Sequence, residues 1–219
     1  MNATATSLYA GDAAARVIRA LLDFRSLWTT HDLVTTSGVP AQSVRGIIDA
    51  LDQEDLVERR APGVVTVPSW LALVRRWNDD FRFTRNSHLT YWRTKPGTPP
   101  LLDRIPTTPI RHAVTGTTAA HHWSPATPTG RTVIYTPDAQ AAATLWELIP
   151  TRTRYKSVVL AEPESDVVYT RSRKTPTGLR LAAPAQVLAD LLTGAATPRT
   201  PAAAPLTNWM QHHELDWRY

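Results

Sequence analysis

Gly38 and Pro40 separate two short segments with helical apolar spacing, and this break constrains the fold more than any other feature of the sequence. The first segment, HDLVTT, follows Thr29 and Thr30, either of which can cap a helix, and it ends at Ser37-Gly38. Pro40 favours the start of a further helix, because its fixed φ suits the first turn. Two short helices joined by a glycine turn are typical of a helix-turn-helix.

The flanking segments extend this pair into a small domain. Between Gly11 and Phe24, apolar residues recur at steps of three and four and predict a preceding helix. After the pair, VERR and VVTV are β-rich runs joined by a Pro-Gly turn, and PSWLALVRRWNDDF predicts a fourth helix. We therefore expect residues 1–80 to form a winged helix-turn-helix domain, with the β-hairpin as its wing.

The helix that follows Pro40 distributes its charge unevenly. Its first two turns, residues 41–48, expose Gln42, Ser43 and Arg45 and contain no acid, whereas acids begin at Asp49. A recognition helix presents its N-terminal residues to base edges, and the helix dipole adds partial positive charge at that end. We expect Gln42, Ser43 and Arg45 to contact bases; the alternative for Arg45 is a surface ion pair with Asp49.

Further cations are candidates for phosphate contacts. Residues 1–80 hold 8 lysines and arginines against 10 acids, whereas residues 81–130 hold 6 against 1. We expect the basic segment 82–95 to contact the DNA backbone without reading sequence; the alternative is that its charge serves the second domain. Its aromatic residues either stack on single strands or, as is more common, form the edge of a core from which the arginines extend into solvent. The wing arginines are either phosphate contacts or solvated strand residues. The predicted DNA contacts are Thr30, Gln42, Ser43, Arg45, Arg59, Arg60, Arg82, Arg85, Arg93 and Lys95.

From residue 81 onward, β-rich runs accompany helical ones. The β-rich runs are HLTYW, HAVTG, RTVIYTP, YKSVVLAEP followed by DVVYTRSR, and GLRLAAP; the helical runs are TTAAHHW, DAQAAATLWELI and AQVLADLLTG, with PLTNWMQHHELDW as a last amphipathic segment. This alternation predicts a C-terminal mixed α/β domain over residues 81–219. The expected fold class of the whole chain is α+β.

Several chemistries are not expected. The chain of 219 residues has no cysteine, which excludes disulfides, thiolate metal sites and a cysteine nucleophile. His121-His122 and His212-His213 are adjacent pairs whose side chains diverge on a helix, so we expect no shared metal. VTGTTAA resembles the glycine-serine turn of nucleotidyltransferases, but the downstream Asp-x-Asp that would hold two metal ions is missing. We therefore expect no cofactor and no enzymatic activity.

The chain also lacks the signals of export and membrane insertion. The N-terminal MNATATSLYAGD has no basic segment followed by an apolar one, and the apolar runs are far shorter than the roughly 20 residues of a membrane span. We expect a cytoplasmic protein that does not associate with membranes.

A series of short motifs resembles one family in particular. The motifs are VRRWNDDF, WRTKPG, LLDRI, RHAVTGTTAA, VIYTPD, VVLAEPESDVVY and LRLAAPAQVLADLLTG. In this order, over about residues 15–210, the sequence is similar to actinobacterial AbiEi-type antitoxins of type IV toxin–antitoxin systems. The resemblance implies an N-terminal winged helix that binds operator DNA and represses transcription, and a C-terminal domain for regulation or neutralisation.

We therefore expect a sequence-specific regulator that binds double-stranded DNA, an autorepressor of the antitoxin kind. The alternative is a protein-interaction or toxin-neutralising module whose winged helix does not read DNA. Since a single winged helix with few arginines makes few phosphate contacts, tight binding would need two copies on half-sites about 10 base pairs, or a multiple of that, apart. The expected protein partner is a cognate toxin or a second copy of the chain, as a homodimer.

Overall fold

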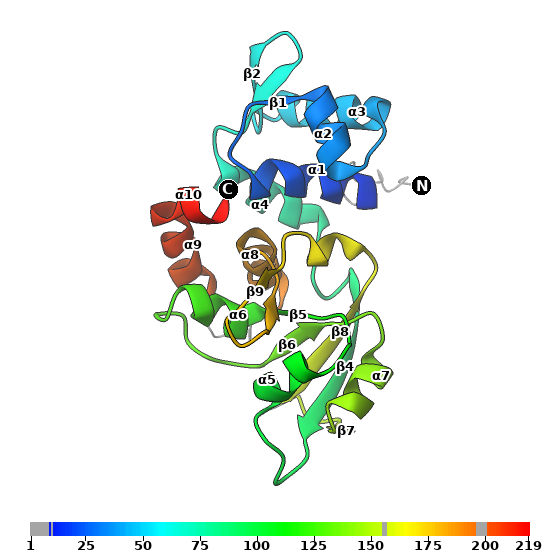
Figure 1. The fold of residues 1–219 in the computed structure, drawn as a ribbon. Helices are drawn as coiled ribbons and strands as arrows, with labels where there is room; N and C mark the ends of the chain where they lie inside the picture. Colours follow the sequence, from blue (N-terminus) through cyan, green and yellow to red (C-terminus); the bar gives the residue numbers. More distant parts are fainter. Residues whose placement is uncertain (1–8, 10, 155–156, 196–200) are drawn as a thin grey trace, which may run out of the picture. The chain divides into compact units, whose positions relative to one another are not determined.

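The computed structural model describes residues 9, 11–154, 157–195 and 201–219, which fall into two compact units (Figure 1). The first unit contains the residues up to Phe81 together with Glu214–Tyr219, and the second contains Arg82–His213. The expected second domain began at residue 81 and ran to the end of the chain; the structure instead groups Phe81 and Glu214–Tyr219 with the first unit. Both units combine helices and strands, so the chain is α+β.

The first unit consists of helices around a small antiparallel sheet. Its elements are α1 (Asp12–Asp23), β1 (Trp28–Thr29), α2 (Thr30–Ser37), α3 (Ala41–Gln53), β2 (Glu58–Ala61), β3 (Val64–Thr66), α4 (Trp70–Asp80) and α10 (Glu214–Trp217). The sheet is three-stranded, in the order β1-β3-β2. The four helices and the hairpin expected in this part of the chain all form, whereas β1 was not expected.

Local signals fix both ends of α2. The Thr29 hydroxyl accepts a hydrogen bond from the backbone N–H of Asp32, and the Asp32 carboxylate accepts one from the backbone of Thr29, which makes a capping box. At the other end, Gly38 takes a left-handed φ of 68° and its N–H donates to the carbonyl of Val34. Glycine adopts this left-handed conformation at the lowest cost, so the turn before α3 follows directly from the sequence.

The end of the chain completes the first unit. Trp217 packs edge-to-face on Trp70 with ring centroids 5.1 Å apart. Arg218 is buried, and its guanidinium donates to three backbone carbonyls at the end of α1, those of Leu21, Leu22 and Phe24. Because the last carbonyls of a helix have no partner within the helix, Arg218 satisfies groups that α1 alone leaves unpaired.

The second unit is built on one mixed sheet. Its elements are β4 (Ser87–Thr94), α5 (Leu101–Arg104), the 3-10 turn η1 (Ile105–Thr107), β5 (Ala113–Thr115), α6 (Gly116–Trp123), β6 (Val133–Tyr135), α7 (Ala139–Leu145), β7 (Leu148–Pro150), β8 (Val158–Pro163), the 3-10 turn η2 (Asp166–Tyr169), β9 (Arg173–Lys174), β10 (Arg180–Leu181), α8 (Pro184–Thr193) and α9 (Ala203–His212). The strand order is β7-β4-β8-β6-β5-β10-β9. The β6–β8 and β5–β10 pairs are parallel, and the others are antiparallel.

Two segments of the second unit differ from expectation. DAQAAATLWELI was expected to be helical throughout, but α7 ends at Leu145 and Leu148–Pro150 join the sheet as β7. Glu147 adopts a positive φ of 50°, which is incompatible with a continuing helix. Residues 166–169, expected among the β-rich runs, form the 3-10 turn η2, which the Ser165 hydroxyl caps by accepting from the N–H of Val167.

A buried polar cluster holds α8 against the sheet. The carboxylate of Asp190 in α8 accepts hydrogen bonds from the hydroxyls of Thr115 and Tyr135 and from the side-chain amide of Gln186. All four residues are fully buried. A buried carboxylate is tolerated only when donors surround it, so this cluster specifies how α8 packs on β5 and β6.

Candidate nucleic-acid interface

The N-terminal half of α3 presents polar groups to solvent. Gln42, Ser43 and Arg45 are exposed, and Arg45 forms no ion pair with any described residue. The helix begins after Pro40, whose side chain makes no capping hydrogen bond, and its first turn holds no acid. The free backbone N–H groups and the positive end of the helix dipole therefore face outward beside a free guanidinium, an arrangement that suits phosphate or base contacts.

The expected alternative for Arg45, an ion pair with Asp49, does not form. Asp49 instead accepts a hydrogen bond from Nη2 of Arg59 at 2.6 Å, and Asp52 accepts one from Nε of the same arginine at 2.7 Å. These bonds raise the pKa of Arg59 above its ordinary value, the bond to Asp52 most of all. Arg59, which was predicted to contact a phosphate, therefore binds two carboxylates of α3 instead.

The other acids that follow α3 are also mostly paired. Glu54 binds the guanidinium of Arg76 in α4 and accepts a hydrogen bond from the Tyr9 hydroxyl at 3.1 Å. Burial and the neighbouring Glu54 carboxylate raise the pKa of Tyr9 to about 12. Glu58 pairs with Arg60 at 2.8 Å.

The acidity read from the sequence is thus largely neutralised within the first unit. Of the acids between residues 49 and 58, only Asp55 has no ion pair with a described residue. Arg59 and Arg60, the expected wing contacts, supply part of this neutralisation, because both have acidic partners. Thr30, the remaining expected contact in this unit, is the first residue of α2 and is half-buried.

The four basic residues expected to act as one segment lie at the two ends of β4. Arg82 and Arg85 belong to the turn before the strand, in which the N–H of Arg85 donates to the carbonyl of Arg82 at 2.9 Å. Arg93 and Lys95 lie at the far end of the strand. An eight-residue strand spans about 26 Å, so the structure does not gather the four cations into one patch. All four are exposed, and none forms an ion pair with a described residue.

The histidine pairs make separate, local hydrogen bonds. Nδ1 of His121 lies 2.8 Å from the carbonyl oxygen of Thr127, and Nδ1 of His213 lies 2.9 Å from that of Trp209. Within residues 9, 11–154, 157–195 and 201–219, no group of three or more His, Asp or Glu side chains is placed to hold a metal ion. Over the same residues, no helix has the length and apolar character needed to cross a membrane.

The sequence did not indicate a further site that lies wholly in the second unit. It is a pocket whose cations, Arg131 and Arg154, are far apart from each other in the sequence and stand on different loops. Arg131 opens the β-rich run RTVIYTP and Arg154 belongs to none of the runs, so only the fold brings the two arginines together.

A comparison of the chain with protein-family models, with curated proteins and with solved structures finds no match. Its function must therefore be inferred from its own residues and their geometry.

Proposed function

We propose that the first unit is a winged helix-turn-helix that binds double-stranded DNA through the N-terminal half of α3. The protein would then act in the cytoplasm as a sequence-specific regulator, an autorepressor of the antitoxin kind. The observation that carries the proposal is the exposed set Gln42, Ser43 and Arg45 at a helix N-terminus that has no acid in its first turn and no side-chain cap. Such a terminus attracts anions, and these three side chains can hydrogen-bond base edges.

Neutralisation of the neighbouring acids supports this role. Asp49 and Asp52 share the guanidinium of Arg59, and they lie in the C-terminal half of α3. A phosphate group that approaches the N-terminal half therefore meets Arg45 before it meets an unpaired carboxylate. The net charge of −2 over residues 1–80 overstates the repulsion that DNA would experience at this face.

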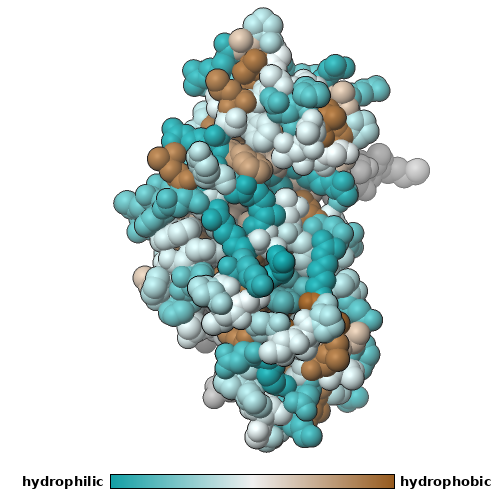
Figure 2. Space-filling view, in the orientation of Figure 1, coloured by the Kyte–Doolittle hydropathy of each residue, from teal (hydrophilic) through white to brown (hydrophobic). Residues whose placement is uncertain are grey.

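The alternative function is a protein-interaction or toxin-neutralising module. Its support is the same net negative charge, together with exposed large hydrophobic residues in the first unit, which are Leu27, Leu215 and Tyr219. None of these belongs to α3, and α3 exposes no large hydrophobic residue. Apolar residues also form only small separate areas on the visible face in Figure 2. Protein interfaces have aromatic or aliphatic centres, so the polar face of α3 favours DNA as its partner.

The small number of free cations sets the expected stoichiometry. Each phosphate contact adds only about 0.9 to the slope of log affinity against log salt concentration, and Arg45 is the free arginine on α3. Tight operator binding would therefore need two copies on half-sites about 10 base pairs apart, or a multiple of that spacing. A complex of one protein with its minimal operator would contradict this stoichiometry.

The deciding experiment is a titration of the full chain against its own upstream DNA at two salt concentrations. Arg45→Ala should weaken specific binding by roughly 1 to 3 kcal/mol and relax the preference at one base position. The matched control is Arg75→Ala, which removes an exposed arginine of α4 that has no ion pair with a described residue. If the two variants lose affinity equally, or if the parent protein binds no DNA, α3 does not read bases.

A further inference from the structure

The second unit contains a pocket that the proposed DNA-binding role does not use. Its volume is about 670 Å³, and its wall includes β4 through Leu89 and Tyr91, β6 through Val133 and the end of α8 through Leu191. This volume lies within the range of about 300 to 1,000 Å³ that is typical of small-molecule sites. All the residues that line it belong to the second unit, so the pocket is a property of that unit alone.

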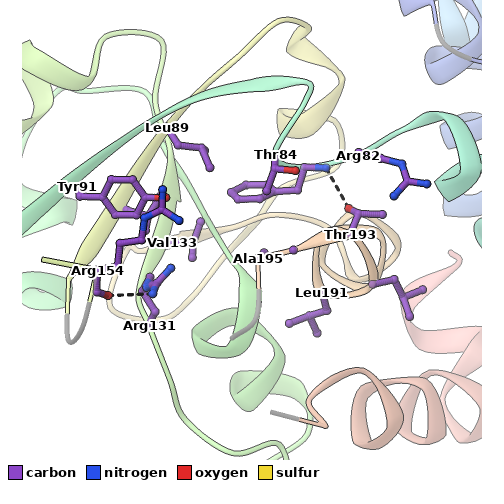
Figure 3. Close-up of a pocket in the computed structure, with 14 residues that line it drawn as sticks. Arg82, Thr84, Leu89, Tyr91, Arg131, Val133, Arg154, Leu191, Thr193 and Ala195 are labelled. Atoms are coloured by element: carbon purple, nitrogen blue, oxygen red, sulfur yellow. Dashed lines mark hydrogen bonds between the residues drawn. The ribbon is translucent and has the colours of Figure 1, made fainter. Parts of the chain in front are cut away.

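One end of the pocket concentrates positive charge around a single aromatic ring. The guanidinium carbon of Arg154 lies 5.2 Å from the ring centroid of Tyr91, and that of Arg131 lies 5.9 Å from it. Nη2 of Arg131 donates to the backbone carbonyl of Arg154 at 2.8 Å, which holds the two arginines together (Figure 3). Two guanidinium groups beside one ring repel each other, and an anion between them would relieve that repulsion.

The hydrogen-bonding capacity of these arginines is incompletely used. Nε of Arg131 is buried and has no hydrogen-bond partner among the described residues, and the guanidinium of Arg154 makes no ion pair with any of them. None of the described residues that line the pocket is acidic. Two guanidinium groups without an acidic neighbour leave their positive charge uncompensated, so the site favours a ligand that supplies anionic acceptor oxygens.

Away from the two arginines, the wall of the pocket is mainly apolar. Phe83, Leu89, Val159 and Leu191 line its body, and Arg82 stands at the opposite end from the arginine pair (Figure 3). The backbone N–H of Phe83 donates to the hydroxyl of Thr193 at 3.0 Å, which fixes the segment that carries the Phe83 ring. A ligand that fills the pocket therefore needs an anionic head and an apolar or aromatic body.

We propose that this pocket binds a small organic phosphate monoester. Its phosphate would lie against Arg131 and Arg154, and its apolar body along Leu89 and Leu191. A phosphate monoester carries close to two negative charges and three acceptor oxygens, which match two guanidinium groups better than a single carboxylate does. This site does not depend on whether the first unit binds DNA.

The test is isothermal titration of the full chain with phenyl phosphate, inorganic phosphate and phenol. Phenyl phosphate combines the required head and body, so it should bind more tightly than inorganic phosphate, and phenol should not bind. Arg154→Ala should weaken binding of phenyl phosphate by roughly tenfold or more, because it removes a charged donor. Since Arg154 is exposed, this variant should unfold at the same temperature as the parent.

The matched control is Arg152→Ala, which removes an exposed arginine two positions away that does not line the pocket. It should leave the affinity for phenyl phosphate unchanged. Equal losses in Arg152→Ala and Arg154→Ala, or no binding of phenyl phosphate at millimolar concentration, would overturn the proposal. Binding of a single-stranded oligonucleotide that requires Arg154, without binding of phenyl phosphate, would overturn it as well and assign the pocket to nucleic acid.

Discussion

Nη2 of Arg59, in the hairpin, lies 2.6 Å from Oδ1 of Asp49 in α3, so the cation expected to meet a phosphate is bonded to an acid of the neighbouring helix. The side chains of Arg59 and Asp49 are 45% and 60% exposed, which leaves the pair open to competition from solvent and from other anions. An exposed pair of this kind can separate, because water screens it strongly. The pairs with Asp49 and Asp52 therefore compete with a phosphate for Arg59 but do not exclude one.

Removal of the two acids should release Arg59. In the double variant Asp49→Asn, Asp52→Asn, the guanidinium loses both charged partners and becomes available to a phosphate. We expect tighter binding to DNA and a slope of log affinity against log salt that is steeper by about 1, the value for one added phosphate contact. Binding titrations across a salt series measure both quantities.

The control for this variant is Asp55→Asn, which removes an exposed acid that pairs with no described arginine. Asp55 has a positive φ of 55°, a conformation that asparagine tolerates, so the change should not disturb the backbone. It should raise the affinity slightly through net charge and leave the salt slope near that of the parent. An equal slope in the double variant and the control would mean that Arg59 does not reach a phosphate.

Substitution of Gly46 should change the stability of the first unit and its affinity for DNA in opposite directions. It is an exposed residue inside α3, and a Cβ added there would meet nothing within 4 Å. Gly46→Ala should therefore stabilise the first unit by about 0.5 to 1 kcal/mol, measured by urea unfolding. We also expect weaker DNA binding, because Gly46 follows Gln42 by one helical turn and its missing side chain lets the backbone approach DNA. Unchanged affinity would leave Gly46 without a role in binding.

The sequence predicted those features whose causes are local. The turn between α2 and α3 follows from a threonine cap, from a glycine with positive φ and from Pro40, all within twelve residues of one another. The hydrogen bond from Arg59 to Asp49 was not predicted, because it depends on how the hairpin packs against α3. The strand order of the second unit and the meeting of Arg131 with Arg154 depend likewise on chain crossings that no local pattern encodes.

Arg218 should be among the most important residues for the stability of the first unit. Its guanidinium donates to three carbonyls at the end of α1 and pairs with Glu214 at 2.8 Å, although burial lowers its pKa. Arg218→Ala would remove the side-chain donor from the buried carbonyls of Leu21 and Leu22, and we expect a loss of about 2 to 4 kcal/mol in the free energy of unfolding. Thermal and urea unfolding measure this loss.

Two further variants test the reason for that loss. Arg25→Ala removes an exposed arginine near the same helix end and should change stability little. Arg218→Lys keeps the charge but lacks the planar set of donors, so it should recover only part of the stability. If Arg218→Lys were as stable as the parent, the positive charge, and not the several hydrogen bonds of the guanidinium, would be what stabilises the end of α1.

The stability of the second unit should depend on pH because of His112. Its Nε2 accepts the backbone N–H of Arg180 at 3.2 Å, so the ring proton is on Nδ1 and can be donated to the carbonyl of Ile110 at 3.0 Å. Burial is the main cause that lowers the pKa of His112 below its ordinary value of 6.5. Protonation of Nε2 would also break the hydrogen bond that it accepts from the backbone N–H of Arg180. The folded state therefore favours the neutral ring.

Because the pKa of His112 is lower in the folded chain than in the unfolded one, its contribution to stability is complete above about pH 6.5. As the pH falls below that value, the unfolded chain takes up the proton first, and stability declines until the pH passes the pKa of the folded state. Urea unfolding between neutral and mildly acidic pH should show this decline in the parent and less of it in His112→Asn, whose amide can still donate to Ile110. His122→Asn, a change at an exposed histidine of α6, is the control and should keep the decline of the parent. A full decline of stability in His112→Asn would mean that the pH dependence does not arise from the buried ring. Loss of the decline in His122→Asn would mean the same.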